Sequence, residues 1–262
     1  MDEIESFLLP VRELVTETEE AYTVVLDVPE DMREHFDYKP GQFLTVAVPS
    51  SETGLAARCY SLSSSPVEDG PLCITVKRTP DGYASHWIGD NVRPGHRMRV
   101  LPPAGIFTPK DLDDDLLLFA AGSGVTPMLS IARSALAVGT GKLVLFYANR
   151  DESSVIFADA WARLEAAHPD RLTVVHWLES ERGLPTQDDI RELAAQHATY
   201  DAFCCGPAPF MRAVSLALRE LDFPRARRHQ EKFVSLGGNP FGDDVAPTEV
   251  DYELGSWDRD GA

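Results

Sequence analysis

The spacing of apolar residues changes near residues 109–114, and this change constrains the fold more than any other feature of the chain. Before it, short runs rich in β-branched residues are separated by Gly, Pro, Asp and Ser, which is typical of strands and turns. Six such runs at close spacing predict a small antiparallel β-barrel. They span residues 8–17, 21–29, 41–49, 57–65, 72–79 and 96–103, with one helical segment at 83–92.

After residue 114, strand-like and helical segments alternate. Residues 116–121, "LLLFAA", form an unbroken apolar run, as expected for a strand buried on both faces of a parallel sheet. The alternation predicts an α/β domain in which helices cover both faces of that sheet. We expect strands at 115–121, 142–150, 171–178 and 201–205, and helices at 126–139, 154–168, 186–197 and 208–221.

We therefore predict two domains and a tail. Residues 1–110 form an antiparallel six-stranded barrel, and residues 111–235 form an α/β parallel-sheet domain of the nucleotide-binding kind. A chain of 262 residues is long enough for both. Residues 236–262 are rich in Gly, Pro, Asp and Glu with little apolar periodicity, which predicts an acidic, linker-like or disordered tail.

Composition excludes several kinds of partner. The formal net charge of −18 argues against nucleic acid, whose binding needs a cationic surface. No apolar run is long enough for a membrane span, and the acidic N-terminal segment is unlike a signal peptide, so we expect a cytoplasmic protein without a membrane partner. The four cysteines show no metal-ligand spacing, so we expect no metal site and reduced thiols at Cys59, Cys73, Cys204 and Cys205.

The strongest local signal is "AAGSGVTPM", residues 120–128. Gly122, Ser123 and Gly124 follow the expected strand, and the next helix is expected to open with Thr126 as its cap and Pro127 at its first position. Glycines let the backbone approach a ligand closely, and the free N–H groups of a helix start attract an anion. The segment predicts a phosphate cradle at the carboxyl end of a strand, although an incidental tight turn would leave a similar pattern.

Three further segments have a similar character. "DGYASHWI" and "CCGPAPFM" each place a glycine before a helix start, the second at the carboxyl end of another strand. Residues 57–65, "ARCYSLSSS", combine an arginine, an aromatic ring and hydroxyl groups on one extended segment. Taken singly, each has a simpler interpretation: a capped helix, a buried structural cysteine, and an edge strand that leads into a serine-rich loop.

These segments occur in one order and at fitting spacing, and together they resemble the ferredoxin–NADP reductase superfamily. The resemblance runs from about Leu8 to Phe233 and is of the oxygenase-reductase type. "RCYSLSSSP", "ITVKRTPDGYASHWI", "YANRDESSVIF" and "HWLESERGLP" are similar to the reductase components of 3-ketosteroid 9α-hydroxylases, with phenylacetyl-CoA epoxidase reductases as close relatives. Such reductases bind flavin on the barrel and a nicotinamide dinucleotide on the α/β domain.

The resemblance implies a flavin site on the barrel. Arg58 would pair with the flavin phosphate, Tyr60 would pack against the isoalloxazine ring, and Ser61 would lie near the flavin N5 that accepts hydride. The other residues that would line the flavin or hold its pyrophosphate are Cys59, Val76, Lys77, Gly82, Ala84 and Ser85.

The resemblance also implies a dinucleotide site that meets the flavin. Cys205 would face the nicotinamide, and Glu231 and Phe233 would lie near the reactive face of the flavin. Of the site residues, we expect Ser61, Cys205 and Glu231 to act catalytically. The residues that would bind the dinucleotide are Gly122, Ser123, Gly124, Thr126, Pro127, Asn149, Arg150, Cys205, Gly206 and Pro207.

The expected cofactors are FAD and NADH. FAD is favoured over FMN because the helix start at Gly82 suits a second phosphate and because the similar reductases use FAD. Asp151 and Glu152 would repel the 2′-phosphate of NADPH, whereas Arg150 would attract it, and the similar reductases use NADH. The chain lacks the C-x₄-C-x₂-C pattern of a plant-type [2Fe–2S] module, which assigns iron–sulfur chemistry to a separate ferredoxin, an oxygenase component or a missing segment.

The function implied is transfer of electrons from NADH through FAD to a one-electron iron–sulfur acceptor of an oxygenase system, in steroid or aromatic degradation. Flavin suits this task because it takes two electrons at once from a nicotinamide and passes them on singly. Two alternatives stay open at this point. One is a reductase that releases free reduced flavin, and the other is a flavin-binding subunit without catalysis.

Overall fold

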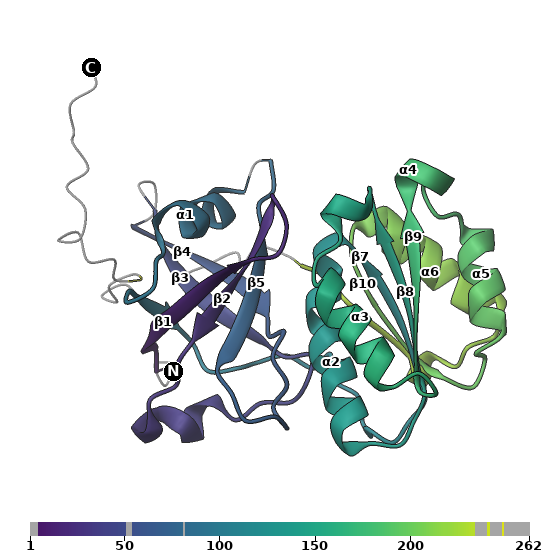
Figure 1. Cartoon of the computed structure of the whole chain (residues 1–262), viewed down its shortest axis with the longest axis horizontal. Coiled ribbons are helices and arrows are strands. Elements are labelled where there is room, and N and C mark those ends of the chain that lie inside the picture. Colours follow the sequence, from purple (N-terminus) through teal and green to yellow (C-terminus); the bar gives the residue numbers. More distant parts are fainter. Residues whose placement is uncertain (1–4, 51–53, 81, 234–239, 242–247, 249–262) are drawn as a thin grey trace.

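The computed structural model describes residues 5–50, 54–80, 82–233, 240–241 and 248. Within them, an antiparallel sheet from the first part of the chain stands beside a parallel sheet from the second part (Figure 1). The predicted fold class, a six-stranded antiparallel barrel followed by an α/β parallel sheet, is confirmed.

The antiparallel sheet has six strands in the order β4-β3-β6-β1-β2-β5. A bridge between Leu62, directly after β4, and Ile74 in β5 joins the two edge strands and so closes the barrel. Side chains such as Leu9 and Val46 fill its interior. The strands are β1 (Phe7–Thr16), β2 (Ala21–Leu26), β3 (Phe43–Ser50), β4 (Gly54–Ser61), β5 (Leu72–Lys77) and β6 (Arg97–Val100).

In the described part of the barrel segment, two short helices accompany the strands. Helix α1 (Tyr83–Asn91) begins directly after Gly82, as predicted, and its Ile88 packs into the barrel core. The Tyr22 hydroxyl donates a hydrogen bond to the Ser85 carbonyl, which fixes the first turn of α1 against β2. The 3-10 helix η1 (Glu30–Phe36) is not apparent from the sequence, because Phe36 is its one buried residue and the segment has no apolar periodicity.

The parallel sheet has five strands in the order β11-β10-β7-β8-β9. They are β7 (Leu116–Ala121), β8 (Leu143–Asn149), β9 (Leu172–Leu178), β10 (Asp201–Cys205) and β11 (Arg228–Glu231). The helices are α2 (Val125–Val138), α3 (Ala158–Ala167), α4 (Glu179–Arg182), α5 (Gln187–Ala195) and α6 (Ala208–Glu220). Leu118 of β7 packs with α2 and α3, whereas Phe119 packs with α5 and α6, so the strand is buried on both faces as its apolar run predicts.

Three elements of this sheet differ from the expectation. Helix α3 starts at Ala158 rather than near residue 154, because the Asp151 side chain caps a separate 3-10 turn, η3 (Glu152–Ser154). Helix α4 and strand β11 have no apolar periodicity, and β11 is a polar four-residue segment, "RHQE". Strand β11 nevertheless pairs in parallel with β10, and this pairing brings Glu231 opposite Cys205.

Among the described residues, polar contacts join the two domains near both ends of α2, and they include the Glu68–Arg133 ion pair near its C-terminal end. The hydroxyl groups of Ser65, between β4 and β5, and Ser134, near the end of α2, are buried and lie 2.8 Å apart. On the side where α2 begins, Arg150 NH2 lies 2.8 Å from Glu20 Oε2. These contacts cross from one predicted domain to the other, and the residue limits of the domains stay a prediction.

Of the predicted tail, the structure describes Pro240, Phe241 and Thr248. Phe241 is buried against Ala47 and Leu101 of the barrel, and the Thr248 hydroxyl donates to the Ala47 carbonyl at 2.5 Å. These residues pack on the barrel, while the prediction for the rest of 236–262 lies outside the described residues. In the part of the chain that the structure describes, no helix is both long and apolar enough to cross a membrane.

Candidate functional site

A cavity of about 510 Å³ opens between the barrel and the start of α2. Strand β4, the end of β5, the start of α1 and the 3-10 turn η2 (Gly122–Gly124) contribute to its wall, so both sheets share it. The sequence-predicted residues on the wall are Arg58, Cys59, Tyr60, Ser61, Lys77, Gly82, Ala84, Ser85, Ser123, Thr126 and Phe233, joined by Thr75, Thr79, Pro80 and Tyr83.

A second cavity, of about 360 Å³, lies at the carboxyl ends of β7 and β8. Ligands of open α/β sheets bind at such strand ends. Lys77 lines both cavities, so the two adjoin at the end of β5. The other predicted residues on the second wall are Gly122, Asn149, Arg150 and Pro207, joined by Ala121, Ala148, Ser154, Glu179, Leu184, Pro185, Pro209 and Phe210.

The remaining predicted residues line neither cavity and are Val76, Gly124, Pro127, Cys205, Gly206 and Glu231. Val76 is fully buried in the barrel core. Gly124 packs against the end of β10, where a Cβ on Gly124 would lie 2.1 Å from the Cys205 carbonyl oxygen and 2.8 Å from Gly206 N. The close approach ties the cysteine to the turn before α2, and Glu231 lies beside it through the β10–β11 pairing.

The turn between β7 and α2 adopts a conformation that favours glycine. Gly122 has a φ of +53°, in the left-handed region. The Tyr147 hydroxyl donates to the Gly122 carbonyl at 3.4 Å and accepts from Ile156 N at 3.1 Å, so β8 and the segment before α3 support the turn. Tyr147 gives no functional signal in the sequence, because it reads as one more apolar residue of a buried strand.

The predicted capping role of Thr126 is wrong. Helix α2 begins at Val125, and the Thr126 hydroxyl, inside the first turn, donates a hydrogen bond to the Ser123 carbonyl at 3.0 Å. Pro127 is the third helical residue rather than the first. The first four N–H groups of a helix have no partner within it, so a proline is still tolerated at this position.

The helices that begin beside the cavities differ from others in their first turns. Among the described residues, α1, α2 and α6 have neither a side-chain cap nor an acidic side chain there. By contrast, α5 is capped by Thr186 and carries Asp188 and Asp189 in its first turn. Free N–H groups and the positive end of the helix dipole attract anions, so these three helix starts suit the phosphates of a ligand.

Buried polar atoms without partners also mark the site. Among the described residues, Ser61 Oγ, Asn149 Nδ2 and Glu231 Oε2 are buried and have no hydrogen-bond partner within 3.5 Å, although the Ser61 hydroxyl is near enough to Glu231 to act on its pKa. A buried polar atom left unpaired costs about 1–3 kcal/mol, so such atoms are candidates for ligand contacts. Ser61 lines the first cavity and Asn149 the second. Together with the uncapped helix starts, they fit ligands that carry polar rings and phosphates, as FAD and a nicotinamide dinucleotide do.

Burial perturbs the titrating groups beside Ser61. It raises the pKa of Glu231 to about 7, while the Ser61 hydroxyl acts to lower it. The pKa of the Cys205 thiol lies well above its ordinary value, first because of burial and then because of the Glu231 charge. Burial likewise raises the pKa of Cys59. Near neutral pH these cysteines are therefore thiols, whereas Glu231 exchanges a proton.

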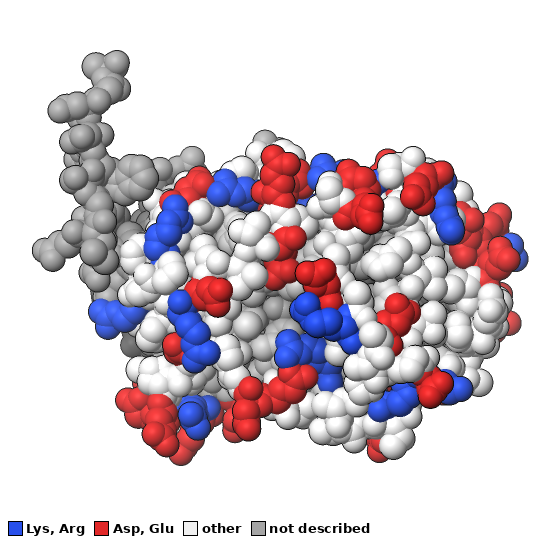
Figure 2. Space-filling view, viewed as in Figure 1, with Lys and Arg blue, Asp and Glu red and all other residues white. Residues whose placement is uncertain are grey.

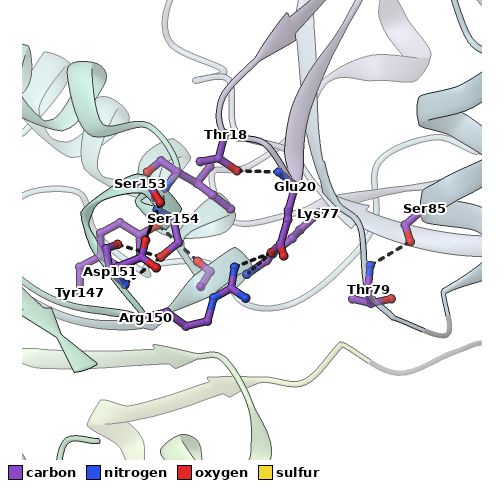
Figure 3. A network of polar contacts seen from close by, with 12 residues as sticks. Thr18, Glu20, Lys77, Thr79, Ser85, Tyr147, Arg150, Asp151, Ser153 and Ser154 are labelled. Carbon is purple, nitrogen blue, oxygen red and sulfur yellow. Dashed lines mark hydrogen bonds and ion pairs between the residues drawn. The ribbon is translucent and has the colours of Figure 1, made fainter. Parts of the chain in front are cut away.

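The cavities carry positive charge in a protein whose formal net charge is −18. Arg58 lines the first cavity, Arg150 the second, and Lys77 both. Figure 2 shows Lys and Arg side chains, with acidic ones beside them, around the hollow between the two domains. Figure 3 shows Lys77 and Arg150 converging on Glu20, which comes from the turn between β1 and β2.

Sequence reasoning missed three residues at this junction. Glu20 gives no signal, because it stands among other acidic residues in a turn about 130 residues away from Arg150. Glu179 and Leu184 line the second cavity and belong to "HWLESERGLP", a segment that carries the family resemblance. That segment was the sequence signal from which Glu179 and Leu184 could have been predicted as site residues.

Two family models match the two parts of the chain. An oxidoreductase FAD-binding domain matches residues 8–108, and an oxidoreductase NAD-binding domain matches residues 118–216. The first includes the strand with Arg58, and the second includes the Gly122 turn and the second cavity's strand ends. The expected pair of cofactor-binding functions, FAD and NAD, is therefore confirmed.

Several known proteins are similar along most of the chain. The ferredoxin reductase component of 3-ketosteroid-9-alpha-monooxygenase from Rhodococcus rhodochrous is 55% identical over 95% of this chain and 70% of its own length. A component of 1,2-phenylacetyl-CoA epoxidase from Escherichia coli is 31% identical over 87% of this chain and 68% of its own. The crystal structure of the Amycolatopsis cytochrome P450 reductase GcoB superposes with a TM-score of 0.75 and 26% identity, over 87% of this chain and 70% of that one.

The relatives and the two cofactor-binding domains agree with the arrangement of the cavities. The chain is an oxidoreductase, and it belongs to the family of FAD- and NAD-binding reductase components that includes the ferredoxin reductase component of 3-ketosteroid-9-alpha-monooxygenase.

Proposed function

We propose that this chain is the reductase of an oxygenase system, which takes electrons from NADH and passes them to an iron–sulfur acceptor. The observation that carries the proposal is the junction at Lys77, where the cavity with the unpaired Ser61 hydroxyl adjoins the cavity at the strand ends. FAD, when bound, accepts a hydride from a nicotinamide and gives up electrons singly. The protein's task is to hold two rings in contact, and adjoining cavities suit that task.

The first cavity would hold FAD. Arg58 and the uncapped start of α1 at Gly82 and Ser85 would bind its phosphates, and Tyr60 would pack against its ring system. The Ser61 hydroxyl would meet a polar atom of the ring, since it has no partner among the described residues.

Three residues would complete the reacting face, two of them behind the wall of the first cavity and one on it. Glu231, with a pKa of about 7, would hold or release a proton beside Ser61. Cys205, a fully buried neutral thiol fixed against Gly124, would back the nicotinamide site with a small uncharged side chain. Phe233 lies on the cavity wall and is half-exposed, so it would cover the ring from the outside.

The second cavity would hold NADH. The starts of α2 and α6 would bind its diphosphate, and Asn149 Nδ2 would find an acceptor there. NADH is favoured over NADPH because Glu179 lines this cavity, and a carboxylate accepts a ribose hydroxyl but repels a 2′-phosphate. Asp151 contributes less to this discrimination than the sequence suggests, since it does not line this cavity and its carboxylate caps the turn at Ser153 and Ser154 instead.

The partner would be an oxygenase component or a separate ferredoxin with an iron–sulfur centre. The Rhodococcus relative is the reductase component of a ketosteroid monooxygenase, which supports a steroid or aromatic substrate for the oxygenase. We further propose a cytoplasmic location, where NADH is available. The proposed division is residues 1–110 for flavin, 111–235 for nucleotide and 236–262 as a linker-like tail.

An anaerobic titration of the FAD-loaded protein with NADH and, separately, NADPH tests the proposal. We expect NADH to bleach the visible flavin band with one equivalent, and NADPH to do so far more slowly. No bleaching by either nucleotide would favour a flavin-binding subunit without catalysis. Loss of all flavin on gel filtration, with activity that depends on added flavin, would favour a free-flavin reductase. A strong preference for NADPH would contradict the role given to Glu179.

A further inference from the structure

The Glu20 carboxylate lies between the two cations of the second cavity. Its Oε2 atom is 2.8 Å from Arg150 NH2 and 3.7 Å from Lys77 Nζ (Figure 3). Lys77 ends β5 of the barrel and Arg150 follows β8 of the parallel sheet, so one carboxylate pairs with a cation from each domain. The side chains of Lys77, Glu20 and Arg150 are 23%, 41% and 57% exposed, so Lys77 is partly withdrawn from water while Arg150 lies largely in it.

The backbone holds Glu20 in this position. Its carbonyl accepts a hydrogen bond from Arg78 N at 2.7 Å, which ties the turn to the residue after Lys77. Its own N–H donates to Thr18 Oγ1 at 3.2 Å within the turn. The carboxylate is thus placed by a fixed turn on β5 rather than by a freely moving loop.

The same place is where an anionic ligand would bind. A Cβ built on Gly122 would lie 3.7 Å from Lys77 Nζ, so the ammonium group stands over the turn that opens α2. The N–H groups of that helix start are uncapped by side chains, and the first turn has no acidic residue. An anion at the helix start would therefore lie close to the Lys77 ammonium group. Among the described residues, Glu20 is the acidic side chain that pairs with Lys77, so it would compete with such an anion.

We propose that Glu20 is an internal counter-ion that competes with the diphosphate of the dinucleotide for Lys77 and Arg150, and that it thereby weakens nucleotide affinity and favours release. The inference rests on the proposed function, since it takes the second cavity as the dinucleotide site. Lys77, Arg150 and Glu20 together carry a net charge of +1, whereas Lys77 and Arg150 without Glu20 carry +2. When the diphosphate pairs with the cations, the Arg150–Glu20 link between the domains is exchanged for links to the ligand.

Charge arithmetic gives the size of the effect. A diphosphate that pairs with the same two cations would lie about 6 Å from the Glu20 carboxylate if each anion took one side of a cation, and at that assumed separation a half-exposed carboxylate changes the dissociation constant roughly fivefold after solvent screening. Salt screens such an interaction, so the effect should shrink as ionic strength rises from about 0.05 M to about 0.5 M.

Calorimetric titration of the FAD-loaded protein with NAD⁺, which binds without redox chemistry, tests the inference. Glu20→Gln removes the charge and keeps the shape, and we expect it to tighten NAD⁺ binding about fivefold at low salt. Glu19→Gln is the matched control, because it makes the same change of net charge one residue away at an exposed side chain for which no ion pair is seen among the described residues. We expect less than about a twofold change for the control.

A double-mutant cycle assigns the effect to the ion pair. In an Arg150→Gln background, Glu20→Gln should tighten NAD⁺ binding clearly less than in the wild type, since one of the cations it competes for is gone. Equal dissociation constants for wild type and Glu20→Gln would overturn the inference. Weaker binding by Glu20→Gln would also overturn it, because Glu20 would then position the cations instead of competing for them.

Two measurements separate failure of this inference from failure of the proposed function. Reduction of the wild-type flavin by NADH tests the function, whereas the ratio of NAD⁺ dissociation constants tests Glu20. Flavin content and melting temperature confirm that each variant is folded, and Glu20→Ala gives a second removal of the charge. If the wild type bound NAD⁺ but both Glu20 variants matched it, only the inference would fall.

Discussion

Gly124 is the position where a single added methyl group should act most directly on the proposed site. A Cβ there would lie 2.1 Å from the Cys205 carbonyl oxygen and 2.4 Å from the Cys205 carbonyl carbon. Carbon and oxygen atoms in contact stay more than about 3 Å apart, so the turn before α2 and the end of β10 would have to separate by about 1 Å. Both obstacles are backbone atoms, which cannot turn away as a side chain can.

The expected cost of Gly124→Ala follows from this overlap. Overpacking of a closely packed site costs about 1–3 kcal/mol, and the immobile backbone puts this site at the upper end. Alanine restricts the unfolded chain and regains up to about 1 kcal/mol, because the φ of −61° at Gly124 is open to any residue. A net loss of about 2 kcal/mol would lower the melting temperature by about 4–8 °C in a protein of this size.

Thermal unfolding and NADH-dependent flavin reduction measure the two consequences. Gly70→Ala is the matched control, since a Cβ at Gly70 would meet nothing within 4 Å and we expect a change below about 0.5 kcal/mol. Because Cys205 lies opposite Glu231 in the sheet, Gly124→Ala should also slow flavin reduction. A Gly124→Ala protein that melts and turns over like Gly70→Ala would refute the close approach of the two backbones.

Three other predictions concern charge, access and capping. The raised pKa of Glu231 means that the wild type loses stability as the pH rises from about 4.5 to about 7. Glu231→Gln should therefore stabilise the flavin-free protein by about 1–3 kcal/mol at pH 8 and by little at pH 4. Urea unfolding at both pH values measures this difference. Cys59 lines the first cavity, while Cys204 is fully buried. Iodoacetamide should therefore label Cys59 in the flavin-free protein and leave Cys204 unlabelled, and bound FAD should protect Cys59; mass spectrometry measures the labelling. Arg171→Ala should cost about 2 kcal/mol in urea unfolding, because Arg171 donates to three carbonyls at and beyond the end of α2; an unchanged midpoint would mean that water replaces it without cost.

Local pattern was enough to predict the architecture. Each of the six barrel strands and the strands β7 to β10 overlaps a run that the sequence pattern predicts to be extended, such as the unbroken apolar run of β7, although β4 ends at Ser61 rather than at residue 65. The glycine turn before α2 was predictable for the same reason, while its role in phosphate binding stays a prediction. A glycine turn followed by a helix start is a local feature, and η2 with α2 forms it within a few residues.

Long-range contacts were not predictable in this way. The place of Glu20 depends on where a turn of the barrel meets the end of β8, and no local pattern encodes that meeting. Strand β11 is stabilised by pairing with β10 rather than by its own polar residues. The role of Thr126 was mispredicted for a local reason. A hydroxyl residue just before an expected helix predicts an N-cap, but the 3-10 turn Gly122–Gly124 leads directly into α2, so the helix starts at Val125 and Thr126 lies inside its first turn.

The contacts between the domains at the two ends of α2 differ in burial, and this difference bears on nucleotide binding between the domains. At one, the hydroxyl groups of Ser65 and Ser134 are buried, Ser134 Oγ also donates to the Ser130 carbonyl at 2.7 Å, and the partly exposed Glu68–Arg133 ion pair lies one residue along the helix. At the other, the Glu20–Arg150 pair is about half-exposed, and exposed ion pairs contribute about 1 kcal/mol or less. Ser134 lies near the end of the 14-residue helix α2, whereas Lys77 stands over its start, so the two points are separated by most of a helix about 20 Å long. The buried hydroxyl contact, with the Glu68–Arg133 pair beside it, holds the domains together at the far end, whereas the Glu20–Arg150 pair lies where the proposed diphosphate would bind. On the proposed function, the ligand would exchange the Glu20–Arg150 contact while the contacts at the far end keep the domains in place.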